Sequence, residues 1–357
     1  MKILHFSYDH PENPWCGGGG AQRTWAVNNY LSEKHDITVV CGAFPNAKLK
    51  QHPFRVIYLG KAKGYIESRL KYIFMSRHLD FKRYDLVVEE FSYYAPIYSR
   101  FSSRPLVTIL HSRHGLRALC YHPVYGIISL MSQYTLVPHR KAVIIVSEHL
   151  RPVVNPKAMI ALIPQGANIP EDLPPSAEKY VLFLGRFDIR IKGLDILIKA
   201  WAQLSPSKMR IPLHIAGPGD RNLVERLIES ERATNINIIG PLNHKEALAA
   251  ISQAAFVCVP SRDEGSPLVV YESFALGKPV IGTAIPALKR LINHGKTGLL
   301  VPPEAPSSLS EAIEELISNN EMRKSLGHGA ANVGKKFSWE KIAHEQEKFY
   351  HKVISCH

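Results

Sequence analysis

Short apolar runs alternate with helix-like segments almost from one end of the chain to the other. In the first half, strand-like runs are expected at residues 2–6, 36–41, 54–59, 85–89, 106–110 and 143–147. The second half repeats this pattern at residues 180–184, 213–216, 236–239, 256–259, 280–282 and 299–301. Strands that alternate with helices form parallel sheets covered by helices on both faces. The pattern therefore predicts an α/β protein with two Rossmann-like halves.

The length of the chain, 357 residues, agrees with two domains of about 100–200 residues each. A proline-rich acidic stretch at residues 164–175 is expected to link them, because prolines cannot continue a helix or a central strand. We expect an N-terminal domain over 1–170, a C-terminal domain over 171–336 and a final amphipathic helix within 337–357, opened by Ser338.

The positive charge lies mainly in the first half of the chain. The net charge is +13, and residues 1–170 hold 21 Lys and Arg against 10 Asp and Glu. Segment 61–83 carries seven cations, with Ile66, Leu70, Ile73 and Phe74 at helical spacing. It is interpreted either as a helix on an anionic membrane or as an amphipathic helix packed on its own domain. No recognition motif accompanies the charge, so a nucleic acid partner is not expected.

The cysteines and the apolar runs indicate the cellular compartment expected for the protein. Five cysteines, odd in number and far apart, favour free thiols over a disulfide framework or a zinc site. No run reaches the roughly 18 apolar residues of a membrane span, and the longest, 124–137, is predicted to be a buried helix. The chain starts directly with a strand-like run and shows no secretory signal pattern. We expect a cytoplasmic protein.

Residues 261–277 carry the most informative chemistry. Ser266 is a suitable N-cap and Pro267 a suitable first helical residue, so a helix is predicted to begin here and to end near Gly277. Glu264 then precedes the helix and Glu272 lies in its second turn. The N–H groups of residues 268–270 would point out of the helix start, where a diphosphate fits. The alternative is an ordinary capped surface helix.

Other candidate residues follow predicted strands, where ligands of α/β sheets collect. A glycine run after the first strand, with Gly18, Gly19 and Gly20, could let a phosphate or sugar approach the backbone, or be a flexible surface loop. It lacks the spacing of a dinucleotide site, which disfavours a dehydrogenase. His111 follows the strand at 106–110 and is a stronger candidate than His114.

Arg186 and Lys192 lie just after the first strand of the second half. Their charges could neutralise a leaving diphosphate, although each alone could be a surface cation.

These residues form a recognisable set: Gly-Arg-x5-Lys-Gly at 185–193, then Pro-Ser-x2-Glu-Gly-x-Pro-Leu-x3-Glu-x3-Leu-Gly-x-Pro-Val-Ile at 260–281. The set resembles glycosyltransferase family 4, which includes phosphatidylinositol mannosyltransferases and bacterial polysaccharide transferases. The resemblance is strongest in the second half. It implies a GT-B fold of two Rossmann-like domains facing a cleft, with the final helix crossing back to the first domain. It also implies retention at the anomeric carbon without a bound metal, and the chain has no Asp-x-Asp pair.

The resemblance also assigns roles to residues. Arg186 and Lys192 would bind the diphosphate, Glu272 the ribose, Glu264 the donor sugar and His111 a sugar hydroxyl near the reacting carbon. The donor site would be completed by the glycine run and by Gly265, Ser266 and Leu268. The glycine run is longer than the usual pair and follows Trp15 and Cys16. The resemblance therefore does not assign which of the glycines face the ligand.

The expected activity is transfer of a hexosyl unit from a UDP- or GDP-linked sugar, with no cofactor, in polysaccharide or glycolipid synthesis. The basic first half favours an anionic or lipid-linked acceptor at the inner face of the cell membrane, where the protein would be peripheral. Two alternatives remain: an inactive nucleotide-sugar-binding module and a nucleotide-sugar epimerase on the same fold. A glycogen-type phosphorylase would need a far longer chain.

Overall fold

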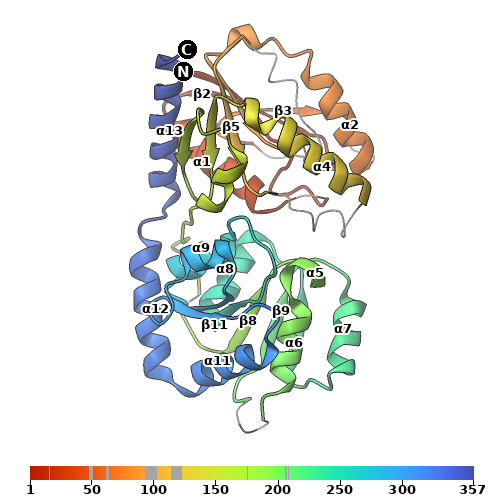
Figure 1. The fold of residues 1–357 in the computed structure, drawn as a ribbon, viewed down its shortest axis with the longest axis vertical. Helices are drawn as coiled ribbons and strands as arrows, with labels where there is room; N and C mark the ends of the chain where they lie inside the picture. The colour runs from red at the N-terminus through yellow and green to blue at the C-terminus, as the bar shows by residue number, and fades with distance from the viewer. Residues whose placement is uncertain are drawn as a thin grey trace. The chain divides into compact units, whose positions relative to one another are not determined.

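The structure is a computed structural model that describes residues 1–15, 17–47, 51–61, 64–92, 103–113, 123–174, 176–205, 207 and 209–357. The chain divides into two compact units, seen in Figure 1. The first unit comprises Met1–Gln165 and Trp339–His357, and the second comprises Gly166–Ser338. The sequence placed these boundaries after residues 170 and 336.

The first unit is built on a parallel sheet of seven strands, in the order β3-β2-β1-β4-β5-β6-β7. Its strands are β1 (Lys2–Phe6), β2 (Asp36–Gly42), β3 (Arg55–Leu59), β4 (Leu86–Glu90), β5 (Leu106–Leu110), β6 (Ala142–Ile145) and β7 (Met159–Leu162). Its helices are α1 (Gly19–Leu31), α2 (Tyr65–Ser76), α4 (Pro123–Thr135) and α13 (Trp339–Ser355), with short 3-10 turns η2 (Phe81–Arg83), η4 (Val137–His139) and η5 (Glu148–Val153). Strand β7 was not predicted, although its residues are all apolar; it is an edge strand and is only partly buried.

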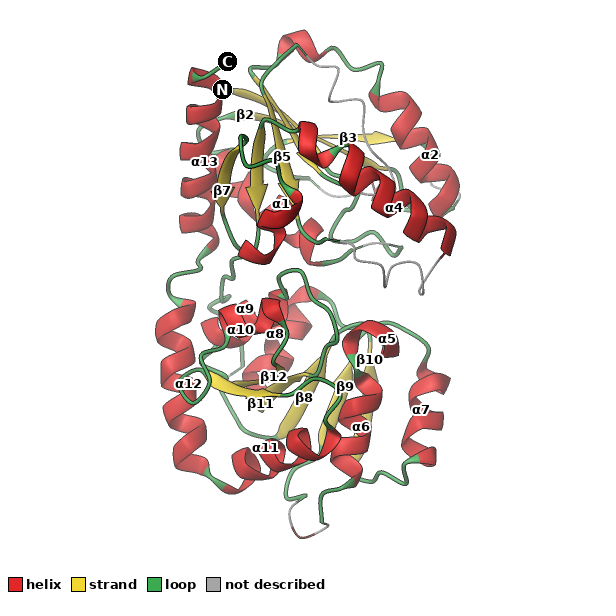
Figure 2. Ribbon diagram, in the orientation of Figure 1, coloured by secondary structure: helices red, strands yellow, loops and turns green. Residues whose placement is uncertain are grey.

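The second unit has a six-stranded parallel sheet in the order β10-β9-β8-β11-β12-β13 (Figure 2). Its strands are β8 (Tyr180–Leu184), β9 (Leu213–Ala216), β10 (Ile236–Gly240), β11 (Ala254–Val259), β12 (Val280–Thr283) and β13 (Gly298–Val301). Its helices are α5 (Ile189–Lys192), α6 (Leu194–Ala202), α7 (Arg221–Ser230), α8 (His244–Gln253), α9 (Leu268–Ala275), α10 (Pro286–Leu291), α11 (Pro306–Ser318) and α12 (Asn320–Gly334).

Alternate residues of the central strands fill two cores, one on each face of the second sheet. Phe183 and Phe256 belong to a core that includes residues of α6 and α11. Leu182 and Val257, their neighbours in β8 and β11, belong to the other core, with residues of α8, α9, α10 and α12. Successive strand residues point to opposite faces, which explains this division. Each fully buried Leu, Val or Phe contributes about 1.5–3 kcal/mol to folding.

The C-terminal helix α13 packs on α1 and belongs to the first unit. The fully buried guanidinium of Arg23, on α1, donates from Nη2 to Gln346 Oε1 of α13 at 2.8 Å. Tyr350, one turn further along α13, is also fully buried. The last helix is thus an integral part of the first unit's core.

Helix α4 corrects one expectation. Residues 124–137 were predicted to be a buried helix, yet Ile127, Met131 and Tyr134 of α4 are each more than half exposed. The small polar residue Ser129 and the amide side chain of Gln133 are buried instead. The helix therefore turns its polar side chains inward and presents an apolar face. Across the described helices, none combines the length and apolar character that crossing a bilayer requires.

Candidate functional site

The strand orders of the two sheets share one feature that locates candidate sites. In each sheet the order reverses at one point: between β1 and β4 in the first unit, and between β8 and β11 in the second. In parallel α/β sheets, ligands bind beyond the carboxyl ends of the strands at such a switch point. The loops that follow these four strands are therefore the places to examine.

In the second unit, the loops after β8 and β11 bring together two predicted residues. Lys192 Nζ donates to Glu264 Oε1 at 2.7 Å, and Ser261 Oγ donates to the same oxygen at 2.7 Å. Only 8% of the Glu264 side chain is exposed, against 22% for Lys192. This pair was predicted as two separate binding groups, and the structure joins them in one ion pair beside the switch point.

Local sequence explains how Lys192 reaches this place. Asp188 caps the short helix α5 by accepting from the Ile191 N–H at 3.1 Å. Gly193 then ends it with a φ of +64°, and a Cβ here would lie 2.1 Å from the carbonyl oxygen of Pro260. Only glycine fits this turn. The close approach holds Lys192 against the loop that carries Glu264.

The Glu264 loop is itself fixed by Arg262. Its two terminal nitrogens donate to the two carboxylate oxygens of Asp195, each at 2.8 Å, and its Nε donates to Glu304 at 2.5 Å. Such forked pairing is geometrically specific. Arg262, which the sequence analysis did not single out, thereby ties the loop after β11 to α6 and to the segment after β13.

Arg186 follows Gly185 at the end of β8 and is exposed. Within the described residues, no hydrogen bond or ion pair engages its guanidinium. An arginine that is already free of partners at a strand end can fork onto an anionic ligand without first losing another contact.

The structure does not have the N-cap predicted for helix α9. The helix begins at Leu268 with Pro267 as its N-cap, one residue later than predicted, and no side chain caps it. The Ser266 hydroxyl is hydrogen-bonded to the Tyr271 hydroxyl at 3.0 Å instead. The Val270 N–H already donates to the Pro267 carbonyl at 3.1 Å. The amides available for an anion are therefore those of Leu268 and Val269, which helix geometry leaves without intrahelical partners.

Glu272, in the second turn of α9, is paired with a residue that the sequence analysis missed. Its Oε1 accepts from His244 Nε2, at the start of α8, at 2.8 Å. The hydrogen bond to Glu272 raises the pKa of His244 above its usual value. Among the described residues, Glu272 Oε2 has no hydrogen-bond partner, so this oxygen can accept from a ligand hydroxyl.

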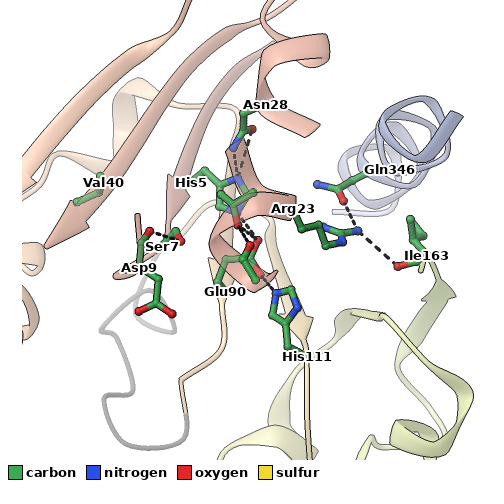
Figure 3. Close-up of polar contacts among 12 residues, drawn as sticks. His5, Ser7, Asp9, Arg23, Asn28, Val40, Glu90, His111, Ile163 and Gln346 are labelled. Carbon is green, nitrogen blue, oxygen red and sulfur yellow. Dashed lines mark hydrogen bonds and ion pairs between the residues drawn. The ribbon is translucent and has the colours of Figure 1, made fainter. Parts of the chain in front are cut away.

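In the first unit, two histidines meet one buried carboxylate at the switch point between β1 and β4 (Figure 3). Glu90, the last residue of β4, contacts His111 Nε2 at 2.5 Å and His5 Nε2 at 3.1 Å. Thr24 also donates to it at 2.7 Å. Burial alone would raise the pKa of Glu90, but His111 and His5 hold it well below its usual range. Glu90 is thus a buried anion that orients His111.

The glycine run lies beside this cluster. A Cβ at Gly20 would lie 3.7 Å from the His111 ring, and one at Gly18 would meet no atom within 4 Å. Gly19 is the first residue of α1, whose N-cap is Gly18. The structure therefore places the glycine run and His111 together, as two strand ends should. Cys16, His114 and Cys120 lie outside the described residues, and Cys41, Cys258 and Cys356 are free thiols.

Most of the predicted site residues therefore fall into two groups, one at each switch point. His244 and Glu90 were missed because each pairs with a residue more than twenty positions away, through sheet topology that no local motif reveals. One signal was present in the sequence: Glu90 lies at the end of an apolar strand, and His111 directly follows another.

Two units, each built on a parallel sheet, agree with the GT-B fold expected from the sequence. Sucrose-phosphate synthase from Thermosynechococcus elongatus aligns with a TM-score of 0.83 over 100% of both chains at 23% identity. HepE of Anabaena, solved in complex with UDP and glucose, aligns with a TM-score of 0.76 over 99% of this chain and 100% of that one at 18% identity. These likenesses confirm the predicted fold.

The family follows from the sequence of the second unit. Residues 164–333 match the family model of glycosyl transferases group 1. An uncharacterized glycosyltransferase of Methanocaldococcus jannaschii is 35% identical over 175 residues, 48% of each protein. The phosphatidyl-myo-inositol mannosyltransferase of Mycobacterium leprae is 28% identical over 186 residues, 51% of this chain and 48% of that protein. The matched region thus spans about half the length of these curated relatives.

Proposed function

We propose that this protein is a retaining glycosyltransferase that moves a hexosyl unit from a nucleoside diphosphate sugar to an acceptor hydroxyl. The observation that carries the proposal is the Lys192–Glu264 pair at the switch point of the second unit. Arg186 follows β8 at the same switch point, and its guanidinium has no partner among the described residues. A cation pair beside a carboxylate matches the charges of such a donor, which has an anionic diphosphate and a sugar rich in hydroxyls.

Each part of the donor has a group suited to it. Arg186 and Lys192 would bind the diphosphate, together with the free amides at the start of α9. Glu272 would accept from the ribose through Oε2 while His244 holds its other oxygen. Gly265 and Ser266 would line the approach to the helix. The complex of HepE with UDP and glucose supports a UDP-linked donor here.

The proposed reaction breaks the bond between the anomeric carbon and the diphosphate oxygen and forms one to the acceptor oxygen on the same face. Negative charge grows on the diphosphate, where Arg186 and Lys192 stabilise it. The sugar becomes cation-like, which a nearby carboxylate such as Glu264 favours. The acceptor proton passes to the departing phosphate oxygen. This scheme requires no protein nucleophile, metal or resident cofactor.

In the first unit, we assign His111 to a hydroxyl of the donor sugar. Its ring is held by Glu90 through Nε2, and its Nδ1 is buried and without a partner among the described residues. A buried ring nitrogen without a partner is costly unless a ligand supplies one. The glycine run would let that ligand approach the backbone closely.

The acceptor is proposed to be lipid-linked and presented at an anionic membrane. On α2, Leu70 and Phe74 are each more than half exposed, and this helix lies in the cation-rich segment 61–83. Helix α4 adds an exposed apolar face with Ile127 and Met131. Apolar side chains flanked by Lys and Arg suit a surface of anionic lipids. The relative named phosphatidyl-myo-inositol mannosyltransferase supports a lipid acceptor, and the inner face of the cell membrane is the proposed location.

Donor binding and turnover together test this proposal. Thermal shifts would be measured with UDP-, GDP- and ADP-linked hexoses, since a ligand at about 100 times its Kd stabilises by about 2.7 kcal/mol. The preferred donor would then be incubated with lipid extracts, and the anomeric configuration of the product determined by NMR. Transfer with retention supports the proposal. Binding without turnover would instead indicate an inactive binding module, and an altered sugar without acceptor would indicate an epimerase.

A further inference from the structure

A cluster of three metal-ligating side chains lies in the first unit, apart from the residues discussed above. His35 lies in the turn between α1 and β2, and Glu347 and His351 lie on α13. One ligand atom from each residue can be chosen so that all three lie within 4.8 Å of one another. Glu347 and His351 are four positions apart on one helix, so they share a face.

This cluster lies at the opposite edge of the sheet from His111. His35 directly precedes β2, which begins at Asp36, so it marks the amino end of that strand. The glycine run and His111 follow the carboxyl ends of β1 and β5. Since all strands of this sheet are parallel, the two sets of residues lie at opposite edges. The cluster is therefore not part of the proposed donor site.

The contacts within the cluster already draw two of the side chains together. His35 Nε2 lies 2.8 Å from Glu347 Oε1, and their side chains are only 7% and 14% exposed. The His35 and His351 rings lie with their centroids 6.1 Å apart. His351 is exposed. An exposed histidine side chain beside two nearly buried ligands has room to turn toward a bound ion.

We propose that His35, Glu347 and His351 bind a divalent transition metal ion of the zinc type. Two imidazoles and one carboxylate are a ligand set that Zn²⁺ accepts, with water in the fourth position. Ligand atoms about 3.3 Å apart surround a tetrahedral Zn²⁺, so small side-chain shifts from the present spacing are sufficient. Of the three proposed ligands, Glu347 lines a neighbouring hollow of about 480 Å³.

The other ring nitrogen of His35 also has a partner. His35 Nδ1 lies 3.3 Å from the Met1 nitrogen. This contact fixes the ring plane toward Glu347.

The bound ion would join the turn before β2 to α13. Its consequence is therefore structural: metal would hold the C-terminal helix on the first unit and stabilise that unit, because a ligand that binds only the folded state raises its stability. Catalysis at the opposite edge of the sheet need not change.

The test uses the full chain without a histidine tag, first treated with EDTA. Zn²⁺ binding is measured by calorimetry, and Co²⁺ binding by the visible absorption of a histidine- and carboxylate-bound ion. His351→Ala is expected to lower the Zn²⁺ affinity by roughly tenfold or more, in line with the usual cost of disturbing a metal site. Zn²⁺ should also raise the Tm of the unaltered protein but not that of the variant.

His344→Ala is the matched control. His344 lies on the same helix and its Nδ1 is 3.7 Å from Glu347 Oε2, but it is outside the three-residue cluster. This variant should keep the Zn²⁺ affinity within about twofold of that of the unaltered protein. Absence of one-to-one Zn²⁺ binding, or loss of affinity in His344→Ala but not in His351→Ala, would overturn the proposal. Because the readout is metal binding, failure here is independent of glycosyl transfer.

Discussion

Lys192 Nζ lies 2.7 Å from Glu264 Oε1, and this contact joins the loops that follow β8 and β11. The two strands are neighbours at the point where the strand order reverses. A cation and a carboxylate are therefore held together where a ligand of this fold is expected. If a donor diphosphate binds here, Lys192 must be shared between the phosphate and Glu264.

This sharing predicts strong coupling between the two residues. Lys192→Met removes the charge that balances a carboxylate of which only 8% is exposed, and Glu264→Gln removes that carboxylate. We expect the double variant to be less destabilised than the sum of the single variants, by roughly 1–3 kcal/mol. Urea unfolding of the four proteins measures this difference. Simple additivity would mean that the ion pair is not energetically coupled.

Arg186→Ala should affect turnover and leave stability unchanged. The side chain is exposed and has no partner among the described residues, so folding does not depend on it. Loss of a preorganised charge on the leaving group is expected to lower kcat by about 10²–10³-fold, or about 3–4 kcal/mol. Arg210→Ala is the control, since Arg210 is also exposed but precedes β9 at the amino edge of the same sheet. Equal activity of the two variants would exclude the assigned role.

The His244–Glu272 contact predicts a pH-dependent contribution to stability. The folded-state pKa of His244 is raised above its usual value, mainly by the hydrogen bond to Glu272. This contribution is fully present below the unfolded-state pKa and is lost as pH rises through the folded-state pKa. Glu272→Gln should therefore cost more stability at about pH 5.5 than at about pH 9. Unfolding curves at both pH values check this, and His244→Gln should remove the difference.

Glu90→Gln tests the positioning of His111. The amide cannot provide the negative charge that now faces His111 and His5, so the His111 ring should lose its fixed orientation. We expect kcat to fall roughly tenfold or more, as for other positioning residues, with a smaller change in KM. Glu148→Gln, which breaks an exposed pair with Arg151, should leave both constants nearly unchanged. A normal kcat for Glu90→Gln would contradict the proposed role of His111 in the site.

Membrane binding should depend on the exposed apolar residues of α2. Replacing both Leu70 and Phe74 by Gln removes side chains that are each worth about 1.5–3 kcal/mol when fully buried. Sedimentation with anionic vesicles should show binding weakened roughly tenfold or more. Ile239→Gln, which alters an exposed apolar side chain of β10, serves as the control. Binding that is insensitive both to these changes and to salt would contradict a membrane surface here.

The local pattern of the sequence predicted most strands and the loops after them, because alternation of apolar strands and helices directly sets a parallel sheet. It failed where a specific side-chain contact, the packing of a helix or the strand order decided the result. Ser266 does not cap α9, since its hydroxyl is bonded to Tyr271. The apolar face of α4 is exposed, although an apolar run alone indicates burial. Pairs such as Glu90 with His111 depend on strand order, which no single motif contains.

The membership of α13 in the first unit restricts how hybrid enzymes can be made from this chain. A single crossover near Gln165 would transplant the first sheet without the helix that supplies Gln346 to the buried Arg23. The transplanted first sheet would then contain Arg23 without its hydrogen-bond partner Gln346, and α1 would no longer be covered by α13. Exchange of the first unit between relatives therefore needs two junctions, after Gln165 and after Ser338, so that both segments of that unit are transferred.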